Sequence, residues 1–190
     1  MAYNLLKGKK GIITGALDEN SIAWKVALKA KEEGASFILT NAPVALRMGK
    51  INELAAACET EVIPADATKV EDIEAIYQQS MEKLGGKLDF VLHSIGMSPN
   101  VRKGRDYGNL NYDWFLKSLD ISALSFHKML QTAEKLDAIN EYGSVVGLSY
   151  IAAQRTFDTY GDMAQAKAVL ESIARSYGAR YGMSKNVRVN

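Results

Sequence analysis

The chain has 190 residues, of which 47% are hydrophobic and 24% are charged, and its formal net charge is +1. This composition is typical of a globular protein, and the length fits one domain, which we expect to span residues 1–190. A nearly neutral chain gives no reason to expect a nucleic acid or an anionic membrane as a partner. No apolar run approaches the roughly 20 residues that a membrane-spanning helix needs.

The cysteine and histidine content excludes two further kinds of site. Cys58 is the only cysteine, so no internal disulfide can form and a reducing compartment is expected. His93 and His127 are far apart in the sequence and have no companion cysteine, so we predict no metal site. The first residues lead directly into an apolar run without a signal-peptide pattern. We therefore expect a soluble, cytoplasmic protein.

Short apolar runs alternate with longer amphipathic segments along the whole chain. The apolar runs predict strands at residues 11–14, 36–40, 61–64, 89–94, 143–149 and 186–190. The amphipathic segments predict helices at residues 22–33, 45–58, 70–84, 112–136 and 160–181. Near-continuous apolar strands separated by helices indicate a parallel sheet that is covered on both faces. We therefore predict an α/β fold with a doubly wound parallel sheet, the Rossmann-like dinucleotide-binding fold, in a single domain.

Sheets of this kind bind ligands outside the carboxyl ends of their strands, so the residues after each strand are candidate contacts. Gly15 follows the first strand, and Ser21 and Ile22 open the next helix, whose free N–H groups favour a phosphate. Because Ser21 is also a good N-cap, a plain strand–turn–helix explains this segment equally well. Asn41 follows the second strand, where NAD-selective dehydrogenases often carry an acidic residue, and Arg47 lies nearby. The choice between NADH and NADPH therefore stays open.

Residues suited to a dinucleotide also follow the later strands. They are Asp66 and Ala67 after the third strand, Ser94, Ile95, Gly96 and Met97 after the fourth, and Leu148 after the fifth. Asp66 can contact an adenine amino group or can simply cap a helix. Gly96 allows a ligand to approach the backbone closely, and we interpret His93 as a hydrogen-bonded structural residue. Together the strand ends predict a site for one extended dinucleotide.

Tyr160 and Lys167 lie near the start of the last long predicted helix, and Tyr150 precedes them. At 3.6 residues per turn, a spacing of seven returns Lys167 to nearly the same helix face as Tyr160, roughly 10 Å along the axis. A phenol and an ammonium on one face can hold a reacting oxygen and a sugar hydroxyl. The strand-end residues favour this interpretation over an interfacial tyrosine and a solvated lysine.

A second Tyr/Lys pair has the Tyr-x-x-x-Lys spacing that many dehydrogenases on this fold use for catalysis. It consists of Tyr181 and Lys185, where the last helix turns into the sixth predicted strand. We expect this position to lie away from the binding crevice. We therefore interpret the pair as part of a helix end, with Gly182 as the cap.

The strand-end residues and the Tyr-x6-Lys spacing form a set that resembles the bacterial enoyl-acyl carrier protein reductases, a divergent branch of the short-chain dehydrogenase/reductase superfamily. The resemblance covers all 190 residues, and it implies reduction of a trans-2-enoyl thioester in fatty acid biosynthesis with NADH, NADPH not being excluded. It implies that Tyr160 is the active-site tyrosine, that Lys167 binds the cofactor ribose and that Tyr150 is a second substrate-pocket tyrosine. The candidate cofactor contacts are Gly15, Ser21, Ile22, Asn41, Asp66, Ala67, Ser94, Ile95, Gly96, Leu148 and Lys167, and the candidate substrate contacts are Gly96, Met97, Tyr150 and Tyr160.

The resemblance also carries expectations about the rest of the protein. The family continues beyond the matched region with a mobile lid and a further strand, so we expect this chain to lack its carboxyl-terminal lid and last strand. The family also implies a homotetramer that acts on carrier protein-bound substrate. The apolar residues Phe115, Leu119, Phe126, Leu130, Leu170, Ile173 and Tyr177 indicate either subunit contacts or two-sided core burial. The basic segment 100–105 is either a contact for the acidic carrier protein or a solvated loop.

In the expected mechanism, Tyr160 donates to the enolate oxygen that forms when hydride reaches the β-carbon, and Lys167 lowers the tyrosine's pKa. One alternative is a 3-oxoacyl or carbonyl reductase on the same fold. That reaction normally needs the shorter spacing, which Tyr160 and Ala164 do not supply. A second alternative is a non-catalytic dinucleotide-binding protein, which the intact set of Tyr150, Tyr160 and Lys167 argues against.

Overall fold

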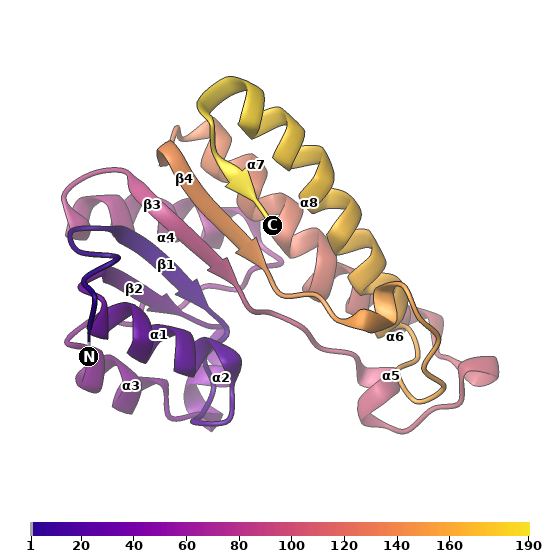
Figure 1. Ribbon diagram of the computed structural model, residues 1–190. Helices are drawn as coiled ribbons and strands as arrows, with labels where there is room; N and C mark the ends of the chain where they lie inside the picture. Colours follow the sequence, from indigo (N-terminus) through magenta and orange to yellow (C-terminus); the bar gives the residue numbers. More distant parts are fainter. Residues whose placement is uncertain (1) are drawn as a thin grey trace.

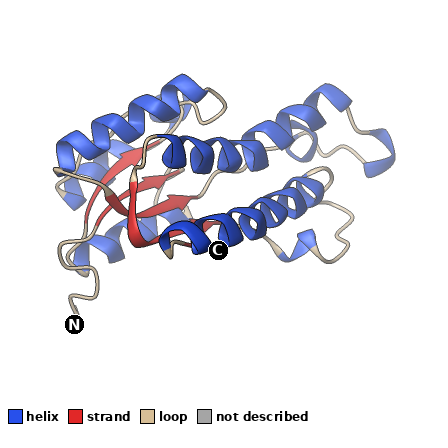
Figure 2. Cartoon of the chain, turned by 90° about the horizontal axis from the view of Figure 1, so that it is seen from above, coloured by secondary structure: helices blue, strands red, loops and turns tan. Residues whose placement is uncertain are grey.

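Five parallel strands form one sheet in the computed structural model, which describes residues 2–190. They are β1 (Lys10–Thr14), β2 (Ser36–Thr40), β3 (Leu88–His93), β4 (Ile139–Gly147) and β5 (Arg188–Val189). Their order across the sheet is β2-β1-β3-β4-β5, and each neighbouring pair is parallel. Because the chain steps outward from β1 in both directions, helices cover both faces of the sheet (Figures 1 and 2). The predicted doubly wound α/β fold is confirmed.

Eight α-helices connect or flank the strands. They are α1 (Ile22–Glu32), α2 (Pro43–Met48), α3 (Ile51–Cys58), α4 (Val70–Leu84), α5 (Pro99–Arg102), α6 (Tyr112–Leu119), α7 (Ser125–Lys135) and α8 (Met163–Lys185). None of the helices within residues 2–190 is long and apolar enough to cross a membrane.

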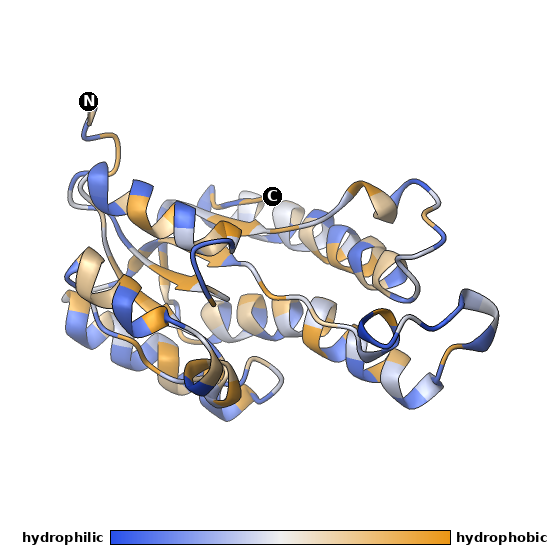
Figure 3. Ribbon diagram, turned by 90° about the horizontal axis from the view of Figure 1, so that it is seen from below, coloured by the Kyte–Doolittle hydropathy of each residue, from blue (hydrophilic) through white to orange (hydrophobic). Residues whose placement is uncertain are grey.

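Alternation along the buried strands divides the core into two layers. Ile12 and Ile13 are adjacent in β1 and both are fully buried, but they pack into different clusters of side chains. Successive strand residues point to opposite faces, so one face packs against α1 and α3 and the other against α4, α7 and α8. Figure 3 shows the hydrophobic residues concentrated on the strands and on the inner sides of the helices. Continuous apolar strands therefore specify a sheet with helices on both faces.

The predicted strand at residues 61–64 is the main error in the expected order of elements. This segment makes a single bridge, between Leu39 and Val62, and is not a strand of the sheet. Backbone bonds to Leu39 and Asn41 continue past Pro64 as far as the Ala65 N–H, so the segment runs beside the end of β2 without forming a regular ladder. The structure therefore has five strands instead of the predicted six.

Three helix predictions also need correction. The helix predicted over residues 45–58 is divided at Gly49, whose extended backbone separates α2 from α3. The long helix predicted over 112–136 is continuous, but a π-helical turn at Asp120–Leu124 joins α6 to α7. The last helix begins at Met163 and not at Tyr160, so Tyr160 lies in the turn before it and does not share a helix face with Lys167 as expected. The helix runs to Lys185 and is capped by Asn186 in the left-handed conformation, so Gly182 lies inside the helix and is not the cap.

The turn after β1 passes very close to the end of β3. Gly15 has a φ of +82°, and a Cβ atom added there would lie 1.9 Å from the carbonyl oxygen of Ser94. The Gly15 N–H donates to the carbonyl of Thr40 at the end of β2, and the Ser94 N–H donates to the Thr14 hydroxyl. Only glycine satisfies both the backbone conformation and the close approach. This contact sets the width of the crevice at the carboxyl ends of the strands.

His93, the last residue of β3, is fully buried. Its Nε2 lies 2.8 Å from the Ser125 hydroxyl, which itself donates to the carbonyl of Ile121 at 2.6 Å. Since a hydroxyl has one hydrogen, this arrangement places a hydrogen on Nε2 and leaves Nδ1, which has no partner within residues 2–190, without one. Burial and, secondarily, the charge of Lys167 lower the pKa of His93 to about 3. His93 is therefore a neutral core residue, which agrees with the structural interpretation.

We predict that replacing Gly15 by alanine lowers the free energy of unfolding by about 3 kcal/mol, because the methyl group must displace backbone at Ser94. Gly8→Ala is the matched control, since Gly8 also has a positive φ (+74°) but no atom lies within 4 Å of its added Cβ. The control should lose only about 1 kcal/mol, the cost of the left-handed conformation. Urea unfolding of both variants measures the difference. If both variants lost the same free energy of unfolding, the close contact between Gly15 and Ser94 would make no separate contribution to stability.

The buried neutral state of His93 should make stability fall on acidification. Below the ordinary pKa of 6.5, the unfolded chain binds a proton at this residue that the folded protein does not bind until about pH 3. The free energy of unfolding should therefore decrease by about 1.4 kcal/mol per pH unit across this window, relative to His93→Gln. Denaturant unfolding of both proteins from pH 7 to pH 4 tests this. If the free energies of unfolding of the wild type and His93→Gln differed by the same amount at every pH, His93 would not be buried in its neutral form.

Candidate active site

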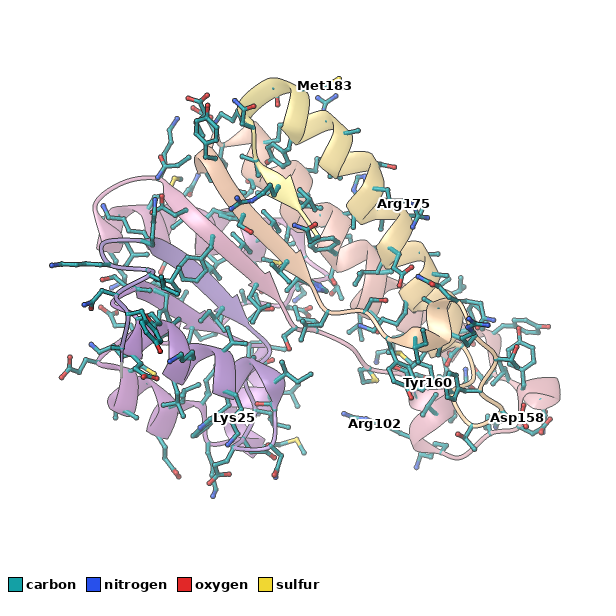
Figure 4. The ribbon with its side chains drawn as sticks, viewed as in Figure 1. Lys25, Arg102, Asp158, Tyr160, Arg175 and Met183 are labelled. Carbon is teal, nitrogen blue, oxygen red and sulfur yellow. The ribbon has the colours of Figure 1, made fainter. Side chains whose placement is uncertain are left out.

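The candidate site lies beyond the carboxyl ends of β1, β3 and β4. There the chain builds an extension from α5, α6, the loop after β4 and the first turn of α8 (Figure 1). Tyr160 lies in this extension, near the segments that carry Arg102 and Asp158 (Figure 4). The extension thus brings together segments that follow β3 and segments that follow β4, beyond the carboxyl ends of the strands.

Lys167 connects the start of α8 to two strand ends. Its side chain is only 6% exposed, and its Nζ donates a hydrogen bond of 2.6 Å to the carbonyl of Leu148, just after β4. A Cβ atom added to Gly96, after β3, would lie 3.5 Å from the same Nζ and 3.4 Å from the Met163 side chain. Burial lowers the pKa of Lys167. The ammonium group is thus held against the bare backbone of Gly96.

Tyr150 and Tyr160 form the other half of the site. Their ring centroids lie 4.8 Å apart with an interplanar angle of 51°, and Phe157 packs against Tyr150 at 5.5 Å. Tyr160 is half-buried, whereas Tyr150 is 44% exposed. Burial and the neighbouring Tyr150 raise the pKa of Tyr160 above its ordinary value. The expected lowering of this pKa by Lys167 is not seen, because the shift is upward and burial is its main cause.

The turn after β1 leaves the start of α1 available to an anion. Ser21 occupies the N-cap position, but its hydroxyl donates to the carbonyl of Asp18 and accepts from the N–H of Leu17. It makes no side-chain bond to the first turn of α1 within the described residues 2–190. Ile22 begins the helix with its side chain 61% exposed. Ser21 and Ile22 thus stand at the amino end of α1 as expected, although Ser21 does not cap the helix through its side chain.

Asn41 has a structural role in addition to its predicted position beside the cofactor. Its amide donates to the carbonyl of Ala16 at 2.9 Å, and its oxygen accepts from the N–H of Ala42 at 2.9 Å. The side chain thereby ties the turn after β2 to the turn after β1. Asn41 also lines a cavity of about 340 Å³.

This cavity contains several of the predicted cofactor contacts. Its lining includes Asp66, Ala67 and Ile95 from the strand ends, together with Asp120 and Ile121 from the π-helical turn. Although burial raises the pKa of Asp66, hydrogen bonds from the Thr68 N–H and hydroxyl bring it below the ordinary value. Lys69, and not Asp66 or Thr68, occupies the N-cap of α4. Asp66 is thus an ionised carboxylate in a turn at the cavity wall.

Sequence reasoning missed a row of buried serines on the helix opposite Lys167. Ser118, Ser122 and Ser125 are fully buried and are spaced by four and then three residues across α6, the π-helical turn and α7. Ser122 accepts from the N–H of Met97 at 2.9 Å, and its Oγ lies 3.5 Å from the sulfur of Met163. The sequence carried a signal for this row, because serines spaced by three or four residues lie on one face of a helix, and that face is otherwise apolar.

The pair with the shorter spacing lies at the other end of the sheet. The Tyr181 hydroxyl is buried and donates to the carbonyl of Leu130, and Lys185 donates to the carbonyl of Ile139, where β4 begins. Lys185 also pairs with Asp137. These bonds hold the carboxyl end of α8, and the interpretation of this pair as a helix end is confirmed.

The chain matches the family model described as enoyl-(acyl carrier protein) reductase over residues 15–190. Enoyl-[acyl-carrier-protein] reductase [NADH] 2 from Rhizobium meliloti is 35% identical over 188 residues, covering 98% of this chain and 68% of the relative. The corresponding NADH enzyme FabI from Rickettsia bellii is 36% identical over 192 residues, covering 100% of this chain and 71% of the relative. The family model thus begins directly after β1 and reaches the last residue of the chain.

Two solved structures share the fold closely. The FabI–NADH complex from Alistipes finegoldii superposes with a TM-score of 0.97 at 65% identity, covering 99% of this chain and 66% of that one. An enoyl-(acyl-carrier-protein) reductase from Anaplasma phagocytophilum in complex with NAD superposes with a TM-score of 0.89 at 28% identity, covering 100% and 71%. This chain therefore spans about two thirds of the length of these proteins. From the residue set, the fold and these matches together, the chain belongs to the enoyl-acyl carrier protein reductase family, the family that its sequence predicted.

Proposed function

We propose that this protein reduces the carbon–carbon double bond of a trans-2-enoyl thioester on acyl carrier protein, with NADH as the reductant. The observation that carries the proposal is the paired rings of Tyr150 and Tyr160 in the same extension as the buried Lys167 and the exposed backbone of Gly96. Membership of the family and the NADH named for its relatives support the choice of reaction and cofactor.

The residues at the strand ends fit a dinucleotide. Gly15 and the amino end of α1 would hold the pyrophosphate, because the turn is narrow and the first N–H groups favour anions. Asp66 and Ala67 in the 340 Å³ cavity would hold the adenine. The absence of a side chain at Gly96 leaves room for the nicotinamide against Lys167. Bound NADH supplies the hydride.

Tyr160 would stabilise the negative charge that develops on the thioester oxygen once hydride reaches the β-carbon. Because burial and Tyr150 raise its pKa, the phenol stays protonated at neutral pH and is a hydrogen-bond donor. A donor that meets charge only as it develops lowers the barrier more than one that binds the ground state equally well. Tyr150, which is partly exposed beside it, would orient the thioester.

Lys167 would act on the cofactor and not on the pKa of Tyr160. One of its three N–H groups is committed to Leu148, which fixes the direction of the ammonium group. The remaining donors would bind the ribose hydroxyls. Because its buried position lowers its pKa, an oxygen-rich ligand also helps to keep this side chain charged.

The surfaces that would meet the carrier protein and other subunits lie on the same extension. The exposed Arg102, Lys103 and Arg105 would contact an acidic carrier protein, and the Arg105 guanidinium is held 5.2 Å from the Trp114 ring. Four of the apolar residues expected at subunit contacts, namely Phe126, Leu130, Leu170 and Tyr177, are buried in the core. A homotetramer in the cytoplasm, as proposed from the family, would therefore use the exposed residues of these helices, including Leu116 and Leu124.

A spectrophotometric assay with the full-length protein tests this function. NADH and NADPH are each supplied with a crotonyl thioester and, in parallel, with an acetoacetyl thioester. Oxidation of NADH with the crotonyl substrate alone supports the proposal. Turnover of only the acetoacetyl substrate would identify a ketone reductase, and cofactor binding without any turnover would identify a binding protein.

We predict that Tyr160→Phe lowers kcat for the crotonyl substrate by about 100- to 1,000-fold, because it removes the donor to the enolate oxygen. The affinity for NADH, measured by fluorescence titration, should stay within about twofold of wild type, since the lost donor acts only in the chemical step. Tyr112→Phe is the matched control, because this tyrosine is 80% exposed on α6. Turnover of Tyr160→Phe at the rate of the control would show that another group is the donor.

A further inference from the structure

The extension contains a buried carboxylate that neither the family resemblance nor the proposed mechanism uses. Asp162 is fully buried, and it forms no salt bridge within the described residues 2–190. An ionised carboxylate in such a place must be compensated by hydrogen bonds. The partners of Asp162 therefore show what it holds together.

Three neutral donors converge on this carboxylate from two different segments. The Ser98 hydroxyl donates to Oδ1 at 2.5 Å, a length typical of a hydroxyl on a charged oxygen. The Asn100 amide donates to Oδ2 at 2.9 Å, and the Ser118 hydroxyl lies 2.8 Å from Oδ2 and 2.7 Å from the carbonyl of Trp114, so its single hydrogen is shared between these two acceptors. All three donors are buried. Asp162 also stands at the amino end of α8, where the helix favours a negative charge.

These partners connect the two halves of the catalytic site. Ser98 and Asn100 belong to the loop after β3 that carries Gly96 and Met97, and Ser118 belongs to α6. Asp162 itself follows Tyr160 by two residues. The residue between them, Gly161, has a φ of +46°, and its added Cβ would lie 3.4 Å from the Val101 side chain. The turn that carries Tyr160 is therefore packed against the segment that Asp162 binds.

We propose that Asp162 is a positioning residue that fixes the Tyr160 hydroxyl relative to the Gly96–Met97 loop, an inference that rests on the function proposed above. A carboxylate suits this task because it offers about four acceptor sites and no donor, so it can bind three donors at once. An amide of the same shape would direct an N–H group at one of those donors. The resulting repulsion would shift the turn that carries Tyr160, without changing any group that touches the substrate.

Asp162→Asn should lower kcat for the crotonyl substrate by roughly 10- to 100-fold, the loss expected when a reacting group is misplaced. The dissociation constant of NADH should change by less than about twofold, since the strand-end contacts are untouched. The matched control is Asp158→Asn, which removes the same charge from an exposed position in the same loop (Figure 4). The control should turn over at the wild-type rate.

The decisive measurement repeats Asp162→Asn in the Tyr160→Phe background. If Asp162 acts by placing the tyrosine hydroxyl, the second substitution should lower kcat by less than about twofold once that hydroxyl is gone. If Asp162→Asn lowered kcat by the same factor in the Tyr160→Phe background as in the wild type, the proposal would be overturned and Asp162 would have a general structural role. A normal rate for Tyr160→Phe alone would instead refute the proposed function, so the two failures are distinguishable.

Two further variants keep the test informative if Asp162→Asn folds poorly. Ser118→Ala removes one donor and leaves the carboxylate in place, so it should show a smaller loss of kcat with the same dependence on Tyr160. Ser98→Ala removes the donor to the other carboxylate oxygen and should likewise lower kcat only while the Tyr160 hydroxyl is present. Wild-type turnover of both serine variants would contradict the proposal.

Discussion

The site depends on the hydrogen bond from the buried ammonium of Lys167 to the carbonyl of Leu148. This bond joins the second turn of α8 to the chain just after β4, and it thereby fixes how the long helix approaches the sheet. Without it, an almost completely buried ammonium would lose its protein acceptor. Because Gly96 has no side chain, the same ammonium stays close to the end of β3. One lysine thus holds two strand ends and one helix in register.

Burial also shifts the pKa values of Lys167 and Tyr160. Burial lowers the pKa of Lys167 and raises that of Tyr160, so in each case the neutral form of the side chain is favoured more than it would be in water. The site therefore presents a protonated phenol before any substrate arrives. Donors that are ordered in advance need no reorganisation when charge develops. Burial accounts for this state of the tyrosine without any charge placed beside it.

Local patterns predicted the parts of the site that sit at strand ends. Apolar runs located β1, β3 and β4 closely enough to put Gly15, Gly96 and Leu148 just after their ends, because a buried parallel strand must be continuous and apolar. The segment 61–64 looked the same in sequence, but it makes a single bridge to β2 and is not a strand of the sheet. The π-helical turn and the bonds of Asp162 could not be predicted, since their partners lie 44 to 64 residues away.

The extension needs these distant polar bonds because it has no sheet to support it. Its helix α5 has only four residues, too few to be stable alone, and its loops contain no strand. Buried side chains replace the missing backbone ladder: Asn100 binds both the N–H and the carbonyl of Asn111, and Asn111 in turn caps α6 through the N–H of Trp114. Asp162 accepts from the same Asn100, so its carboxylate closes the network at the start of α8. The turn that carries Tyr160 is therefore supported by a network of buried polar side chains, whereas the residues at the strand ends are supported by the sheet.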